Sequence, residues 1–203
     1  MSSKSEILAR IRKRLPESTP LPDLNGPWIS YPEREKQFVE VLSFVGGQTV
    51  VAETPTGLAA LVREMPAFQS ARQIVCTVPE LNSGDGAAIG NFDLSAIDDP
   101  HDVASVDLAI LPGEFAVAEN GAVWVSGRTV KHRAIYFLTQ HLVLVVPRLQ
   151  MVDHMHQAYE RLQFESSGYG LFISGPSKTA DIEQSLVIGA HGPRSLTVVL
   201  FGT

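Results

Sequence analysis

The segment His141–Pro147, HLVLVVP, decides the fold class, because it is an unbroken apolar run that ends at a proline. Such a run predicts a strand buried on both faces, as in a parallel sheet with helices on either side. Residues 72–78 (RQIVCTV), 106–112 (VDLAILP) and 195–201 (SLTVVLF) show the same pattern. Several strands of this kind are therefore expected to share one sheet.

Helical patterns separate these runs. Residues 33–47 place apolar side chains on one face and end at two glycines, and residues 54–65 begin with Thr-Pro, which favours a helix start. A short strand is expected between them at 48–53, and two more helices at 149–162 and 179–190. The alternation predicts a three-layer α/β domain with a mainly parallel sheet and helices on both faces.

Two connections within this domain have their own signatures. Residues 115–126 are two β-rich runs around Asn120-Gly121, a strong signal for a β-hairpin. Residues 79–103 are polar, acidic and rich in Gly, Asp and Pro, and they predict a long surface connection.

The chain is expected to divide into three parts. Residues 1–15 form an amphipathic helix whose composition also fits a transit peptide, although a docked arm or a partner-binding helix fits equally well. Residues 16–30 are a proline-rich linker, and residues 31–203 form one α/β domain. Since no apolar stretch reaches the roughly 18 residues needed to cross a bilayer, we expect a cytoplasmic protein without a membrane span.

Charge is unevenly distributed. Residues 1–15 carry five bases and one acid, so their net charge is +4. The rest of the chain has a net charge of −10, which gives the total of −6. Nine acids and no Lys or Arg lie between Arg72 and Arg128, which argues against a nucleic-acid partner for the domain. From Arg128 onward the chain has seven basic and five acidic residues, so an anionic ligand is expected to bind in the C-terminal third.

Several site classes are disfavoured. The chain has no glycine fingerprint for dinucleotides, no phosphate loop ending in Gly-Lys-Ser/Thr and no Gly-x-Ser-x-Gly nucleophile motif. The single cysteine, Cys76, excludes an internal disulfide and an iron–sulfur cluster held by this chain alone, and its apolar surroundings predict a buried strand position without a catalytic role.

The tetrapeptide Asp153-His154-Met155-His156 raises the question of a metal site. Histidines two residues apart do not share one face of a helix, and this segment has helical spacing. We therefore assign no metal, interpret the histidines as solvated, and expect Asp153 to cap the helix.

The strongest candidate ligand site is the loop between a predicted strand at 168–174 and the predicted helix at 179–190. Small residues, hydroxyls and one lysine at a helix start suit phosphate or carboxylate, whereas acidic residues in the first turn oppose an anion. A purely structural helix cap is the alternative. The candidate ligand-binding residues in this loop are Ser174, Gly175, Ser177, Lys178, Thr179 and Asp181.

Carboxylates and a histidine extend this candidate site. Asp181, Glu119 and Glu114 are candidate general bases or hydroxyl ligands if the hairpin and the helix start meet. His191 is expected either to cap the end of a helix or to join the site.

The closing sequence ISGPSKTADIEQSLVIGAHGP, followed by RSLTVVLF, resembles the lactate utilisation protein C family of LUD-domain proteins. The segments AILPGEFAVAENGAVWVS, QHLVLVVPRLQMV and SSKSEILARIRKRL are similar to other parts of that family. The family commonly has Ala-Glu-Thr-Gly-Thr at the hairpin, whereas this chain has Asn120 and Ala122 in place of the two threonines.

The resemblance implies a fold similar to the group of phosphosugar isomerases and CoA transferases. It also implies a bacterial cytoplasmic protein that acts with two partners, one of them an iron–sulfur protein, in the oxidation of L-lactate to pyruvate. On this reading the chain is an accessory subunit without a cofactor of its own, and the iron–sulfur clusters lie on its partners. The alternative is a stand-alone small-molecule enzyme or sensor that binds an anionic ligand.

Overall fold

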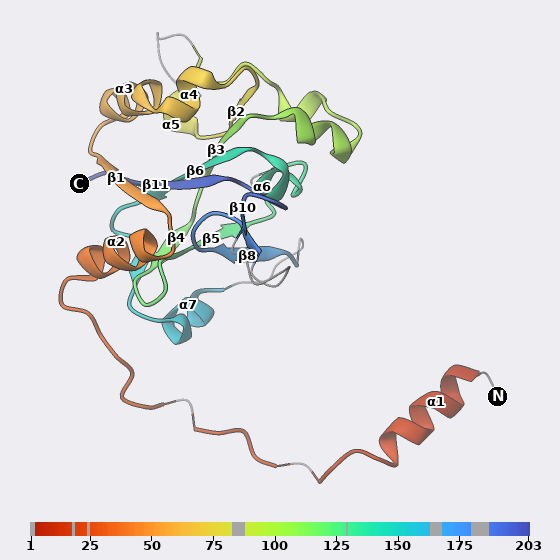
Figure 1. The fold of residues 1–203 in the computed structure, drawn as a ribbon. Coiled ribbons are helices and arrows are strands. Elements are labelled where there is room, and N and C mark those ends of the chain that lie inside the picture. Colours follow the sequence, from red (N-terminus) through yellow and green to blue (C-terminus); the bar gives the residue numbers. More distant parts are fainter. Residues whose placement is uncertain are drawn as a thin grey trace.

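Five parallel strands form the main sheet, in the spatial order β1-β11-β6-β3-β2 (Figure 1). The computed structural model describes residues 3–17, 19–23, 25–82, 88–128, 130–162, 168–179 and 187–203. The strands are β1 (Gln48–Ala52), β2 (Ile74–Cys76), β3 (Leu108–Pro112), β6 (His141–Pro147) and β11 (Ser195–Phe201). The mainly parallel sheet predicted from the apolar runs is therefore confirmed.

Helices α3 (Pro55–Glu64), α4 (Pro66–Ser70) and α5 (Pro79–Asn82) cover one face of this sheet (Figure 1). Leu58 and Val62 of α3 pack there with Val143 and Val145 of β6. The predicted start of α3 is confirmed, because the Thr54 hydroxyl accepts a hydrogen bond from the backbone N–H of Gly57 at 3.1 Å.

The opposite face is covered by helices and by a second sheet. The helices are α2 (Arg34–Phe44) and α6 (Ile135–Leu138), and the sheet has the order β7-β4-β5-β8. Its strands are β4 (Phe115–Val117), β5 (Ala122–Ser126), β7 (Met151–Val152) and β8 (Gly170–Ile173). Strands β4 and β5 are antiparallel, which confirms the predicted hairpin.

Helix α7 (Met155–Arg161) packs on the outer face of the second sheet, where Phe115, Trp124 and Ala158 share a small core. The prediction of one helix over 149–162 was wrong in its first part. Met151 and Val152 form β7 beside β4, and the N–H of Ala118 donates to the carbonyl of Val152 at 2.9 Å. Their burial, which was read as a helical stripe, comes from this strand.

The remaining elements are short. The connection predicted at 79–103 contains α5, the 3₁₀ helix η1 (Leu94–Ala96) and the start of a second 3₁₀ helix, η2 (Pro100–Ser105). Near the C-terminus, β9 (Lys178–Thr179) and β10 (Val187–Ile188) form an antiparallel pair.

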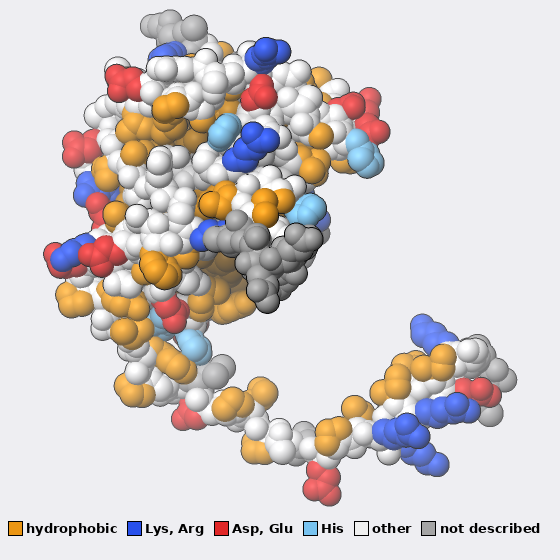
Figure 2. Space-filling view, viewed as in Figure 1, with side chains coloured by type: hydrophobic (Ala, Val, Ile, Leu, Met, Phe, Trp, Pro, Cys, Tyr) orange, Lys and Arg blue, Asp and Glu red, His pale blue; other side chains and the backbone are white. Residues whose placement is uncertain are grey.

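Helix α1 (Ser3–Arg12) contains no buried residue, and extended chain separates it from the domain in Figure 1. Basic and apolar side chains lie along this arm in Figure 2, and they include the exposed Ile7, Leu8 and Ile11. The helix predicted in this region is present. Within the described ranges, no helix has the length and apolar character required to span a membrane.

Two glycines of similar backbone conformation allow a test of the hairpin packing. Gly121 and Gly168 have φ values of 64° and 54°, but a Cβ at Gly121 would lie 2.9 Å from the backbone nitrogen of Leu42, whereas one at Gly168 would meet no atom of the described residues within 4 Å. We expect Gly121→Ala to lower the free energy of unfolding by about 1–2 kcal/mol more than Gly168→Ala, because only the former forces α2 and the hairpin apart.

Urea denaturation followed by circular dichroism measures both variants. Equal losses would show that the backbone contact between the hairpin and α2 contributes nothing to stability.

Candidate functional site

Two short antiparallel strands of the closing segment stand where the sequence predicted a strand-to-helix loop. Strand β8 belongs to the second sheet, and Lys178 and Thr179 pair with Ile188 and Val187. The helix predicted at 179–190 is therefore wrong at both of its described ends, and Asp181 lies outside the described residues. The pairing of β-branched residues across this hairpin overrides the helical spacing read from the sequence.

A strand-to-helix loop of a parallel sheet is expected at the carboxyl edge, but this loop lies beside Pro193, just before the start of β11. The N–H of Ser177 donates to the carbonyl of Pro193 at 2.9 Å, and the carbonyl of Ser177 accepts from the N–H of Gly189 at the same distance. The N–H of Ser177, one of the loop donors expected to contact an anion, is therefore used within the protein. The helix-dipole argument for this loop therefore fails, although its side chains remain candidate ligands.

Three separate segments nevertheless meet here, at what we call the glycine junction: residues 42–46, 119–121 and 174–178. Gly175 has φ of 74°, and a Cβ on it would lie 2.6 Å from the carbonyl oxygen of Val45. The Ser174 hydroxyl donates to the carbonyl of Asn120 at 2.7 Å. Because the backbones approach this closely, the small residues of the closing motif have a packing role.

The side chains of the predicted site are only partly brought together by this junction. Lys178 is exposed, and its stem lies beside Gly46. The carboxylate of Glu119 accepts from the N–H of Met155 at 2.9 Å and so serves the start of α7. The exposed His191 precedes Gly192, which packs against Ser177.

Glu114 and Glu119 do not form a pair. They lie at opposite ends of β4, five residues apart, which corresponds to about 16 Å along an extended strand. The hairpin turn has its own internal bond, since the Asn120 side-chain oxygen accepts from the N–H of Ala122 at 3.1 Å.

An ion pair that the sequence did not reveal joins the buried Asp153, near the start of α7, to the half-exposed Arg34. Asp153 is 1% exposed, and its carboxylate accepts from Arg34 Nε at 2.7 Å and from a second guanidinium nitrogen at 2.9 Å. The N–H of Tyr31 donates to the same carboxylate at 3.1 Å. Burial alone would raise the pKa of Asp153, but the Arg34 and Tyr31 hydrogen bonds outweigh it and the pKa is lowered.

Two predictions about this segment were wrong. The residue that caps α7 is His154, whose Nδ1 accepts from the N–H of Gln157 at 3.4 Å, and not Asp153. His154 is buried, and the ring of His156 stacks on Trp28 at 3.7 Å between centroids, so neither ring is freely solvated. In the described part of the chain no three His, Cys, Asp or Glu side chains gather as metal ligands, and the assignment of no metal stays a prediction.

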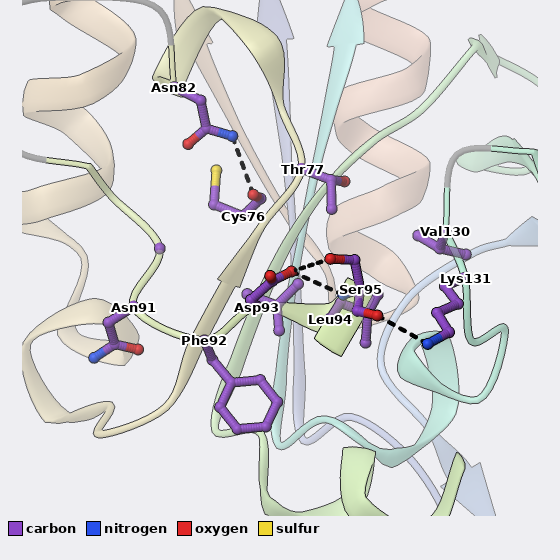
Figure 3. A pocket seen from close by; sticks show the side chains of 12 residues that line it. Cys76, Thr77, Asn82, Asn91, Phe92, Asp93, Leu94, Ser95, Val130 and Lys131 are labelled. Carbon is purple, nitrogen blue, oxygen red and sulfur yellow. Dashed lines mark hydrogen bonds between the residues drawn. The ribbon is translucent and has the colours of Figure 1, made fainter. Parts of the chain in front are cut away.

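A cavity of about 450 Å³ lies at the carboxyl end of β2 (Figure 3). Cys76 and Thr77 line it together with Asn82 and residues 90–95 and 130–131. Ligands of α/β proteins bind at this edge of the sheet, so the cavity is a candidate site in its own right.

Most polar groups around this cavity bind one another. Lys131 donates to the carbonyls of Ser95 and Ile97 at 2.8 and 2.5 Å, and Asp93 accepts from the N–H of Ser95 at 2.8 Å. Burial raises the pKa of the Cys76 thiol, so it is a weak nucleophile at neutral pH, in agreement with the predicted structural role. The buried Thr77 hydroxyl has no hydrogen-bond partner among the described residues.

Comparisons with known proteins give a consistent result. A family model described as LUD domain matches residues 2–201. The Lactate utilization protein C of Geobacillus kaustophilus is 33% identical over 172 residues, which are 79% of this chain and 65% of that protein. The protein of the same name from Geobacillus thermodenitrificans is 31% identical over 172 residues, again 79% of this chain and 65% of its own length.

The chain thus matches only 65% of the length of either of these relatives. Among solved structures, a DUF162 family protein from Deinococcus radiodurans superposes with a TM-score of 0.57 at 17% identity, over 86% of this chain and 100% of that one. At this identity the likeness concerns the fold alone.

The Arg34–Asp153 pair predicts a pH-dependent contribution to stability. Asp153→Asn should lower the free energy of unfolding at pH 7 by about 2–3 kcal/mol, because the buried carboxylate is removed and Arg34 loses its partner. Since the folded-state pKa of Asp153 is lowered, its contribution is complete above the unfolded pKa of about 4 and is lost only as pH falls through the folded-state value. Denaturation at pH 7, 5 and 3 measures the difference.

Glu35→Gln is the matched control, because Glu35 also accepts two bonds from one arginine, Arg148, but its side chain is 38% exposed, whereas that of Asp153 is 2% exposed. We expect it to cost less than about 1 kcal/mol. A loss for Asp153→Asn that is no larger than this, or that already narrows between pH 7 and 5, would contradict the prediction.

Proposed function

Because the chain belongs to the LUD domain family, we propose that it is an accessory subunit of a bacterial lactate-utilisation system that oxidises L-lactate to pyruvate with iron–sulfur partner proteins. The observation that carries the proposal is the family match over residues 2–201, together with relatives named Lactate utilization protein C. The proposed location is the cytoplasm.

The cysteine count supports a division of labour between subunits. Oxidation of lactate to pyruvate releases two electrons, and an iron–sulfur cluster that accepts them is held by several thiolates. This chain has only Cys76, which is partly buried in β2. The clusters are therefore assigned to the partner proteins.

Helix α1 is the proposed contact with a partner. Residues 1–15 carry a net charge of +4, and Ile7 and Ile11 are about half exposed on α1, at 54% and 52%. An amphipathic basic helix of this kind fits an apolar groove with an acidic rim.

Growth on lactate tests the proposed role. Deleting the gene for this chain in the organism that encodes it should abolish growth on L-lactate as sole carbon source, while growth on pyruvate stays normal because pyruvate lies after the proposed step. A plasmid-borne copy should restore growth. Undiminished growth of the deletion strain on L-lactate would contradict the proposal.

Removal of residues 1–15 tests the proposed contact. The truncated chain should keep its melting temperature, because α1 contributes no buried residue, but should retain at least tenfold less of a cysteine-rich iron–sulfur protein in affinity purification at low salt. Substituting Arg10 and Arg12 by Gln in the full chain should weaken retention in the same direction, whereas Lys36→Gln on α2 should not. Full retention by the truncated chain would rule out α1 as the contact.

The alternative function, a stand-alone enzyme or sensor for a small anion, is favoured by the exposed Lys178 at the glycine junction. Lys178→Ala should then weaken binding of lactate, pyruvate, phosphate or CoA about tenfold in calorimetry, with little loss of stability, because one charge-assisted contact is removed. Lys36→Ala, another exposed lysine, is the control. Absence of binding of all four compounds to the wild type would dismiss this alternative.

A further inference from the structure

A second cavity, of about 380 Å³, lies at the amino-terminal edge of the main sheet. Its walls come from the first residues of β1, β6 and β11 and from the end of α3 and the start of α4. Leu61, Met65 and Val50 give it an apolar side, and its volume suits a small organic molecule. The glycine junction and the Cys76 cavity are built from other residues.

A serine and a histidine lie side by side in this cavity. Ser195 and His141 are direct partners in the register of β11 and β6, and Ser195 Oγ lies 2.7 Å from His141 Nδ1. Both side chains line the cavity, so the pair is accessible to a molecule inside it. A hydroxyl within hydrogen-bond reach of an imidazole is the core of an activated serine nucleophile.

The surroundings of His141 keep its imidazole neutral and able to accept a proton. Burial, followed by the nearby Arg194, lowers the pKa of His141, while Asp107 acts in the opposite direction. The imidazole is therefore neutral at pH 7. The Asp107 carboxylate is fixed by the N–H groups of Arg72 and Gln73 at 2.8 and 3.0 Å, and its charge stabilises the imidazolium formed when His141 takes up a proton.

Hydrogen-bonding groups are available for the polar part of a ligand. Thr197 and Gln48 line the same cavity and are partners in the register of β11 and β1. They lie one row further along the sheet, at about 6.6 Å from the Ser195 row. The cavity thus combines a nucleophile, a base, further donors and an apolar wall.

We propose that Ser195 and His141 form a nucleophile–base pair that cleaves small carboxylic esters with a short apolar acyl group in this cavity. Ser195 Oγ attacks the ester carbonyl carbon and its proton passes to His141 Nδ1. The new Oγ–carbon bond forms as the bond to the alcohol oxygen breaks, and the alcohol leaves with the proton from His141. Water then attacks the acyl-serine, with His141 again as the base, and releases a carboxylic acid and the free serine.

Hydrolysis of p-nitrophenyl acetate and labelling by phenylmethylsulfonyl fluoride test this inference. The wild type should release p-nitrophenol faster than buffer and carry one sulfonyl group on Ser195, located by peptide mass mapping. Ser195→Ala should lose both, and His141→Gln should slow both about a hundredfold. Ser105→Ala is the control, since the Ser105 hydroxyl donates to the backbone carbonyl of Asp102 and not to an imidazole.

The pH profile distinguishes a base from a structural histidine. Labelling should be constant above pH 7 and fall in acid through a pKa below the ordinary 6.5, because protonated His141 cannot accept the serine proton. The charged groups that face this region are Asp107, Arg194 and Glu64. A rate in acid equal to that at pH 8 would contradict the assignment of His141 as base.

A cysteine variant keeps the test decisive if Ser195→Ala misfolds. Cys76→Ser with Ser195→Cys leaves one thiol in the chain, beside His141. Iodoacetamide should alkylate it at least tenfold faster at pH 7 than in the same variant carrying His141→Gln, since the imidazole promotes thiolate formation. Equal rates, or the absence of a sulfonyl group on wild-type Ser195, would overturn the proposal.

Discussion

Burial of β6 on both faces is the constraint on which the rest of this structure depends. Leu142, Leu144 and Val146 face the core shared with α2 and the second sheet, and Val143 and Val145 face α3. Its backbone pairs with β3 on one side, from His141 to Val145, and with β11 on the other along its whole length, so most of its polar backbone groups are used within the sheet. Helix α3 thus covers one face of β6, and α2 and the second sheet cover the other.

The two ends of the main sheet are used differently. At the carboxyl end, β3 and β6 continue directly into β4 and β7, so the second sheet grows out of the first. At the amino end the strands begin beside the cavity that holds Ser195 and His141. The proposed partner contact, α1, and the cavity of Ser195 and His141 lie on different elements, so the proposed roles in lactate utilisation and in ester cleavage can be tested separately.

The glycine junction shows that the closing motif has a structural role. Gly175 lies against Val45, and Gly121 lies against Leu42, at distances where any side chain would collide with backbone atoms. The motif therefore fixes the second sheet against the end of α2 whether or not its side chains hold a ligand. This close packing explains the small residues of the motif without a bound phosphate.

The Arg34–Asp153 pair likewise connects α2 to the second sheet, near the N-terminal end of the domain. Arg34 begins α2, and Asp153 follows β7 on the second sheet. Their bonds, together with the N–H of Tyr31 and the stacking of Trp28 on His156, attach residues 28–34 to the domain.

The sequence by itself determined the buried strands, the hairpin at Asn120-Gly121, the start of α3 at Thr54 and the absence of a thiolate cluster. These are local properties, since an apolar run, a turn dipeptide or a cap acts over a few residues. Only the tertiary structure decided that Met151–Val152 is a strand, that Lys178 lies in a hairpin, and that the partners of Asp153 and Ser195 are Arg34 and His141. Those pairs are 119 and 54 residues apart, and local periodicity reports that a residue is buried but not which distant residue lies against it.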